Sequence, residues 1–469
     1  MPDLPSELWT QIFDLAADQA LILQHRLPTA MSGLEHFHQN NLGGWSTGWS
    51  AESMQQQLNW VQRRSYRTKK AIVLTCKRWR ALEHESLFRF LCFRAAPSRL
   101  CDILDTSAAA ATTTAASLGW WTRRIHADVT FDPMIQFEEV HNALVRILRH
   151  CPNLEILVVP RTLHGSFSAI ADALVCHAAN SLRALCINIQ APMLHELLAT
   201  LPALPYICAA HINLHPGGQH VITPAGSDDR IRLPHLQQLS LSGCPHQLIH
   251  VAKHWHLPAL RALSLSCNTP TEAHHPAIPA FLAAHGAQLT ALELYSKPDM
   301  PMPLARMLAA CPALTTLAFN GDWAFDLSSD EGAPQGTPPF AHACLARVGL
   351  HGLGLHGLVP ELYMLDTPLE AEREAARMNE RALALLCDRA RFPALRCLRV
   401  LSVAVVRERE RVQHDWGDAA RRLARAWAHW DRMLARAEIQ LEDCFGEVLP
   451  PWPWDYTERH EDEVKQAED

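Results

Sequence analysis

One short pattern of apolar positions, Leu-x-x-Leu-x-Leu, recurs along the chain from about residue 120 onward. Its clear copies begin at Leu154, Leu182, Leu236, Leu260, Leu289, Leu314, Leu345 and Leu395, and degenerate copies begin at Thr122 and Leu204. Successive side chains of a β-strand point to opposite faces, so the fourth and sixth positions should point inward and the third, fifth and seventh should face solvent. The pattern therefore predicts one short strand in each copy.

The spacing of these copies indicates a repeat architecture. Between residues 122 and 345 the intervals bracket the ~20–29 residues of leucine-rich repeats, with some longer units. A single unit cannot bury its leucines alone, whereas stacked neighbours supply a common core. Helical stretches between the strands, such as residues 140–150 and 303–310, would line the convex side. We therefore expect an α/β leucine-rich-repeat solenoid, an irregular horseshoe, over residues 120–449.

A doubly wound α/β sheet is the main alternative, because its fully buried strands also read as apolar runs. Against it, the prolines that precede several copies recur in the same place, at Pro152, Pro234, Pro258, Pro312 and Pro393. A doubly wound sheet has no reason to reuse that feature, so the pattern favours the solenoid.

The spacing of the copies breaks after Leu350. Two charged helices are predicted as insertions, at residues 368–391 and, rich in Arg and Trp, at residues 407–433. The second of these is expected to cap the solenoid. The last segment, residues 450–469, ends in a run of acids and is expected to be a solvated tail.

Two apolar helices are predicted before the repeats. In the first, Leu8, Ile12 and Leu15 recur at helical spacing, and Pro5 suits the first helical position because its missing N–H would have had no partner there. The second runs through residues 72–82 with the same spacing. A bland interpretation of this pair is a helical cap on the solenoid, since solenoids need capped ends.

The order of two sequence stretches resembles the F-box family. These stretches are Leu4-Pro5-x-Glu7-Leu8-x-x-x-Ile12-Phe13 and Leu74-Thr75-Cys76-Lys77-Arg78-Trp79-Arg80-Ala81-Leu82. The resemblance implies a small all-α module over residues 1–95 that packs on a Skp-type adaptor. An insert, residues 19–69, separates the two halves, as in many fungal F-box sequences, and a low-complexity linker, residues 96–119, follows. The adaptor contacts that the resemblance implies are Leu4, Pro5, Leu8, Ile12, Phe13, Leu74, Cys76, Trp79 and Leu82.

This resemblance implies a function as well as a fold. The chain would be the substrate-recognition subunit of a Skp-cullin-F-box type ubiquitin ligase, reaching cullin through the adaptor and holding a protein target on the repeats. Catalysis in that family belongs to other subunits, so neither a catalytic residue nor a cofactor is expected. The alternative is a leucine-rich-repeat scaffold that binds a partner without any ligase role.

The outward strand positions suggest where a target would bind. In the later repeats these positions become large or charged, and they give the candidate target-binding residues Glu293, Tyr295, Arg347, His351 and Arg399. Binding hot spots favour Tyr, Trp and Arg. The alternative is that these are ordinary solvated strand residues.

Composition narrows the partners and the compartment. The formal charge of −7 argues against a nucleic-acid partner, which requires a basic surface. Neither a leader segment nor a membrane span is expected, since the longest uncharged stretch, residues 106–122, is mostly Ala, Thr and Ser. Fourteen cysteines without a Cys-x-x-Cys fit a reducing cytoplasm or nucleus.

Three further patterns resemble active sites. Residues 44–48 match Gly-x-Ser-x-Gly, but neither a strand nor a helix is predicted beside them. Residues 352–357 match Gly-x-Gly-x-x-Gly and follow a strand-like segment, but Pro360 and a non-periodic stretch follow in place of the helix that a dinucleotide site needs. His246, His250 and His254 share one face of a predicted helix whose opposite face is apolar. We interpret the first motif as a chance match, the second as a turn of a repeat, and the histidines as a solvated stripe, so that no metal site is expected. A hydrolase would rest on the first match alone.

Overall fold

A computed structural model describes residues 4–17, 22–27, 29–31, 51–93, 97–111, 117–127, 137–162, 167–215, 231–243, 245–267, 276–296, 304–320, 340–351, 369–401, 406, 409 and 418–451. The chain divides into two compact units. The first unit comprises Met1–Pro28 and Gly48–Leu260, and the second comprises Thr29–Thr47 and Arg261–Asp469.

Among its described residues, the first unit begins with α1 (Ser6–Ala16), α3 (Ala51–Thr75) and α4 (Lys77–Glu83), here called the helical module. Pro5 precedes α1 in an extended conformation, and its carbonyl accepts the first helical hydrogen bonds from Leu8 and Trp9. The single helix predicted through residues 72–82 is in fact two helices. The chain is extended at Cys76, where φ is −158°. The Cys76 sulfur caps the start of α4 by accepting a hydrogen bond from the Trp79 N–H.

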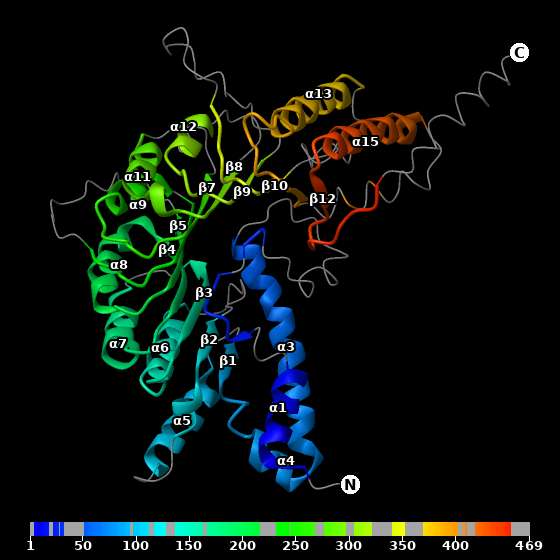
Figure 1. The fold of residues 1–469 in the computed structure, drawn as a ribbon. Helices are drawn as coiled ribbons and strands as arrows, with labels where there is room; N and C mark the ends of the chain where they lie inside the picture. The colour runs from blue at the N-terminus through cyan, green and yellow to red at the C-terminus, as the bar shows by residue number, and fades with distance from the viewer. Residues whose placement is uncertain are drawn as a thin grey trace, which may run out of the picture. The chain divides into compact units, whose positions relative to one another are not determined.

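Within the described part of the first unit, six parallel strands follow, each hydrogen-bonded to the next in chain order. They are β1 (Phe90–Phe93), β2 (Arg124–Ala127), β3 (Ile156–Thr162), β4 (Ala184–Gln190), β5 (Ala209–His215) and β6 (Gln238–Gly243). Their connections carry α5 (Ser98–Ala110), α6 (Phe137–Leu148), α7 (Ser168–Ala178) and α8 (Leu194–Thr200), and α9 (Pro245–Ala252) follows β6. Figure 1 shows α6, α7 and α8 together on one side of the strands.

The second unit repeats this arrangement, again with parallel strands paired in chain order. Its strands are β7 (Ala262–Cys267), β8 (Ala291–Ser296), β9 (Thr316–Asn320), β10 (Arg347–His351), β11 (Cys397–Val400) and β12 (Gln440–Glu442). Its helices are α11 (Ala277–His285), α12 (Leu304–Ala309), α13 (Leu369–Leu386) and α15 (Asp418–Arg436), and short 3-10 turns accompany several elements of both units. The predicted parallel α/β repeat arrangement is therefore confirmed in both units.

The periodic leucines predict the strands closely, since most strands begin two residues after the first residue of a copy. The copy placed at Leu204 is the exception. Ala209 pairs with Ala184, so Ile207 rather than Leu204 is equivalent to Leu182. Two strands, β1 and β12, were not predicted; β12 has only Leu441 as a buried apolar residue, and β1 lies inside residues 1–95.

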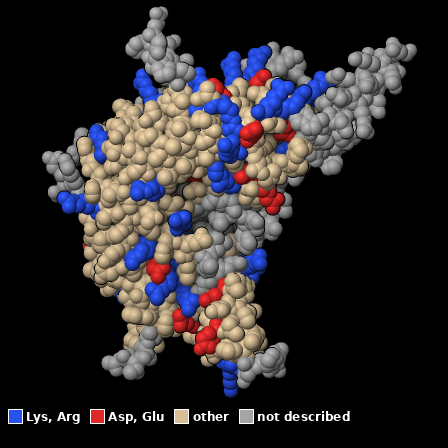
Figure 2. Space-filling view, in the orientation of Figure 1, with Lys and Arg blue, Asp and Glu red and all other residues tan. Residues whose placement is uncertain are grey.

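Other segments also differ from the sequence-based expectation. Within residues 96–119, expected to be a linker, Ser98–Ala110 forms α5 and buries Cys101 and Leu104. The charged helices are present as α13 and α15, and α15 buries Trp427 and Trp430. Figure 2 shows Lys and Arg gathering over α13 and α15 in this view. In the described part of the chain, no helix is long and apolar enough to cross a membrane.

Candidate functional site

The helical module is held together by aromatic residues. The rings of Trp9 and Phe13 lie on α1, and both contact the ring of Trp79 on α4, with centroids 4.9 and 5.0 Å from it. Arg78 of α4 adds a hydrogen bond to the residues that precede α1, because its guanidinium donates to the Leu4 carbonyl at 3.1 Å. These contacts fix the orientation of α1 against α4.

The helical module also exposes several apolar side chains. The exposed fractions are 43% for Leu8, 44% for Ile12, 77% for Leu15 and 63% for Leu74. A scattered exposed leucine is ordinary, but Leu8, Ile12 and Leu15 follow helical spacing and share one face of α1. We call Leu8, Ile12 and Leu15 the exposed stripe, and Leu74, near the end of α3, is a further exposed leucine of the module.

The expected adaptor contacts are distributed unevenly between surface and interior. Leu8 and Ile12 belong to the exposed stripe, and Leu74, Pro5 and Cys76 are also exposed. Phe13 is 2% exposed, so its place is in the packing of the module. The remaining three, Leu4, Trp79 and Leu82, are half-buried.

The helical module also contains a buried polar contact. Lys69 of α3 donates to the Ser86 carbonyl at 3.0 Å, and burial lowers the pKa of Lys69 to about 8. Burial likewise raises the pKa of Glu83 above its ordinary value, while Lys69 opposes that rise. This contact joins α3 to the turn that leads into β1.

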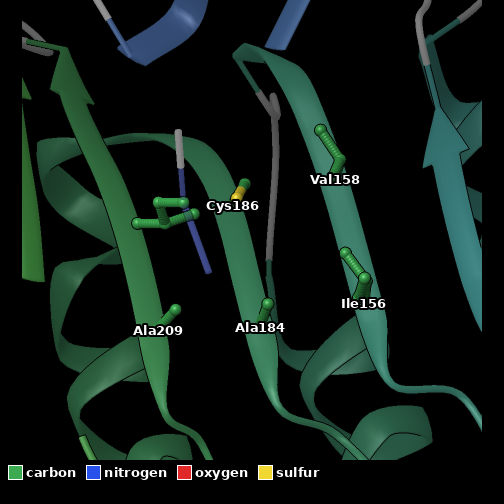
Figure 3. Close-up of a cluster of buried hydrophobic side chains, with 6 residues drawn as sticks. Ile156, Val158, Ala184, Cys186 and Ala209 are labelled. Carbon is green, nitrogen blue, oxygen red and sulfur yellow. The ribbon is translucent and has the colours of Figure 1, made fainter. Parts of the chain in front are cut away.

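The expectation that third and fifth strand positions face solvent is wrong for much of the first unit. Ile156, Val158, Ala184, Cys186 and Ala209 are all buried, and Figure 3 shows them on adjacent strands, along the same face. The sequence could not indicate what covers them, because the covering residue lies far away in the chain. That residue is Leu27, which packs into the same cluster.

Residues 22–27 contact the strands mostly through backbone atoms. The side-chain amide of Gln238 accepts from the Leu27 N–H at 2.8 Å and donates to the Leu27 carbonyl at 3.3 Å. The Arg124 guanidinium donates to the Ile22 carbonyl at 3.3 Å, and the His25 ring lies 2.6 Å from the Glu155 carboxylate. Residues 22–27 thus lie along the strand face of the first unit.

In the second unit, residues 29–31 occupy a row of fifth-position strand residues. This row is Glu293, Ala318, Gly349, Arg399 and Glu442, which pair with one another across β8 to β12. Glu293 accepts from the Ala30 N–H at 2.8 Å, and Arg399 donates to the Met31 carbonyl at 2.8 Å. The Met31 side chain is 8% exposed and packs on Ala318 and Leu401.

The two charged ends of this row, Glu293 and Glu442, have different surroundings. Burial raises the pKa of Glu293 to about 7, against the opposing effect of hydrogen bonds from the Ala30 and Met31 N–H groups. The Arg399 guanidinium lies 2.6 Å from a Glu442 oxygen, and Arg347 lies 3.1 Å from the same oxygen. Although burial opposes it, hydrogen bonds from Cys397 and Arg399 hold the pKa of Glu442 below its ordinary value.

The five predicted target-binding residues therefore have different surroundings. Glu293 and Arg399 contact residues 29–31, and Arg347 reaches this row through Glu442. His351 is buried, and burial lowers its pKa to about 4. Tyr295 lies in β8, and its side chain is outside the described residues.

The motifs that resembled active sites add little. Both glycine motifs, residues 44–48 and 352–357, lie outside the described residues, as does the tail beyond 451. His250 and His254 are exposed, Leu248 and Trp255 are buried, and the His246 side chain is not described. Within the described ranges, no group of three His, Cys, Asp or Glu side chains is arranged to hold a metal ion.

Comparison with known protein families finds no match for this sequence, and comparison with curated proteins finds none either. What the geometry defines is a parallel α/β repeat protein. It carries a helical module with an exposed apolar stripe, and strand faces lined by a segment of its own chain.

Proposed function

We propose that this chain is the substrate-recognition subunit of a Skp-cullin-F-box type ubiquitin ligase. In this proposal the helical module is an F-box that binds the adaptor, and the repeats are leucine-rich repeats that bind a protein target. The role is non-catalytic and supplies proximity, which turns a bimolecular encounter into an effectively intramolecular one. The compartment proposed is the cytoplasm or nucleus, which is consistent with free thiols on the cysteines whose side chains the structure describes.

The observation that carries the proposal is the exposed stripe. Leu8 and Ile12 of this stripe, and also Leu74, lie at positions where the sequence resembles the F-box, and they remain accessible, whereas Phe13 is buried and contacts the ring of Trp79. An apolar stripe supported by a rigid aromatic cluster is well suited to bind the apolar face of another protein's helices.

The test is capture of a Skp-type adaptor by the full-length chain, with Leu8→Asp as the variant. An aspartate buried in the interface would be an unpaired charge, which costs several kcal/mol, about 3 kcal/mol or more. We expect capture to fall at least ~100-fold, since each ~1.4 kcal/mol is a factor of ten. Val175→Asp is the matched control, because Val175 is 36% exposed on α7, far from the stripe in sequence.

Undiminished capture by Leu8→Asp combined with Trp79→Ala would contradict the proposal. If the wild-type chain captures no adaptor at all, while its repeats still bind a protein partner, the scaffold function without a ligase role would be the better account.

A further inference from the structure

The row of residues beneath Met31 in the second unit recognises peptide backbone. Glu293 on β8 accepts from the N–H groups of Ala30 and Met31, and Arg399 on β11 donates to the Met31 carbonyl. Any peptide with the same backbone conformation presents these donors and this acceptor. The polar contacts therefore select a conformation, whatever side chains the peptide carries.

Between these two polar residues the floor of the row selects for a side chain. Ala318 and Gly349 occupy the fifth positions of β9 and β10, where longer side chains would fill the space taken by Met31. A Cβ atom added to Gly349 would lie 2.5 Å from the Met31 sulfur and 2.8 Å from a Leu401 methyl group. The floor therefore fits a narrow, unbranched apolar chain that enters end-on, which is the shape of methionine.

The charges in this row argue for a binding role over a purely structural one. Burying a carboxylate and a guanidinium is costly, and well-packed apolar residues at the same positions are often as stabilising or more so. In the first unit Leu27 packs on apolar residues at the equivalent strand positions, among them Ile156, Val158 and Ala184, and the buried Arg124 guanidinium donates to the Ile22 carbonyl. Glu293 and Arg399 are instead arranged on the two sides of one peptide segment.

We propose that the row Glu293, Ala318, Gly349, Arg399 and Glu442 is a binding site for a short peptide segment that carries an unbranched apolar side chain. Thr29–Met31 fills this site in cis, so that a segment of a partner protein binds by displacing it. The inference deepens the proposed role of the repeats as a protein-binding surface, and it does not depend on the adaptor.

Competition with the tethered segment makes the proposal measurable. A segment held in the same chain competes at an effective concentration of the order of millimolar. An external peptide should therefore bind poorly to the wild-type chain and better once the tethered segment is weakened. Met31→Asp weakens it by placing a charge on the apolar floor, and Ala30→Pro weakens it by removing the N–H that Glu293 accepts.

The experiment uses the full-length chain and a fluorescent peptide with the sequence of residues 28–35, followed by anisotropy. We expect Met31→Asp and Ala30→Pro to bind this peptide at least ~10-fold more tightly than the wild type does. A peptide with norleucine in place of methionine should bind equally well, one with isoleucine at least ~10-fold more weakly, and one with aspartate not measurably. Circular dichroism and the midpoint of urea unfolding report whether each variant is folded.

Equal peptide binding by wild type and folded variants would overturn the proposal, as would equal binding of the methionine and aspartate peptides. Loss of folding in both variants would also count against it, because the segment would then be a fixed part of the core. Loss of adaptor capture with intact peptide binding would instead contradict the ligase role alone.

Discussion

A terminal nitrogen of Arg399 lies 2.8 Å from the carbonyl oxygen of Met31, although the two residues are 368 positions apart in the chain. The same guanidinium contacts Glu442 at 2.6 Å, and its side chain is 5% exposed. One arginine therefore connects the segment at residues 29–31 to the last strand of the second unit.

The first prediction concerns the pairing of Arg399 with Glu442. Arg399→Met removes the contact to Met31 and leaves the Glu442 carboxylate with fewer partners, so we expect the free energy of unfolding to fall by about 3 kcal/mol. Urea unfolding at pH 7 measures this change. The double variant with Glu442→Gln should recover much of the loss, because it removes the charge that was left behind.

Arg396→Met is the matched control for that experiment. Arg396 precedes the same strand, but its side chain is 66% exposed and lies 3.9 Å from an exposed Glu438. Exposed pairs contribute little, so the variant should unfold like the wild type. Equal losses from Arg399→Met and Arg396→Met would refute the importance assigned to the buried pair.

A second prediction tests the floor under Met31. Gly349→Ala adds a methyl group that must displace the Met31 sulfur and a Leu401 methyl, and overpacking of this kind costs about 1–3 kcal/mol. Shortening the side chain with Met31→Ala relieves the first of these two clashes. The double variant should therefore lose less stability than the sum of the two single variants.

Non-additivity has its own control. Gly349→Ala combined with Val175→Ala, an exposed position on α7 of the first unit, should be additive within about 0.5 kcal/mol. Strict additivity of Gly349→Ala and Met31→Ala would mean that the two side chains do not meet in solution.

The third prediction is a pH dependence that arises at Glu293. Burial raises the pKa of Glu293 to about 7 from an ordinary value of 4.5, so the folded chain holds this proton more tightly than the unfolded chain does. Its contribution to stability is therefore fully present below pH 4.5 and is lost as the pH rises toward about 7. Glu293→Gln should remove this decline, as measured by urea midpoints between pH 5 and 8.

Two buried histidines act in the opposite direction, so only the difference between wild type and variant isolates Glu293. Burial lowers the pKa of His211 and of His351 to about 4, against an ordinary value of 6.5. Their unfavourable protonation reduces stability as the pH falls from about 6.5 toward 4. If Glu293→Gln leaves the slope between pH 5 and 7 unchanged, the assignment to Glu293 is wrong.

The fourth prediction concerns the start of α4. The Cys76 sulfur accepts from the Trp79 N–H at 3.4 Å, and a hydroxyl oxygen is a stronger acceptor at this position. We expect Cys76→Ser to raise the stability of the helical module by up to about 1 kcal/mol. Cys76→Ala should lower it slightly, and thermal unfolding followed by tryptophan fluorescence measures both changes. An alanine variant as stable as the serine variant would show that this cap contributes nothing.

The sequence determined the strands because their signal is local. An apolar residue at the fourth or sixth position of a copy is buried by any neighbouring copy, as Leu185 and Ile187 are. The alternation of apolar residues with a period of two therefore predicts the strand without knowledge of its surroundings. The signal failed where the local pattern is weak. At Leu204 the degenerate copy could be aligned in two registers, and only the pairing of Ala184 with Ala209 distinguishes them.

The helices of the module were predictable only in part: α1 and residues 72–82 follow an apolar period, whereas the start of α3 at Ala51 lies within residues 19–69, which were expected to be an insert. The break at Cys76 was not predicted. The apolar period continues through Cys76, although the backbone there is extended. An amphipathic period records which face is buried, and it does not record whether the hydrogen bonds along the helix are continuous. The packing of Trp79 against Trp9 and Phe13 belongs to the tertiary structure.

What covers the strands was decided only by the tertiary structure. Residues 22–31 have no apolar period, and most of their polar contacts to the strands are made by backbone atoms, such as the Leu27 amide on Gln238 and the Met31 carbonyl on Arg399. Backbone groups are nearly the same in every residue, so the side-chain pattern of a sequence cannot predict which of them will bind the strands. The sequence thus determined the repeats and their buried leucines, and long-range backbone recognition determined that Glu293 and Arg399 hold a segment of their own chain.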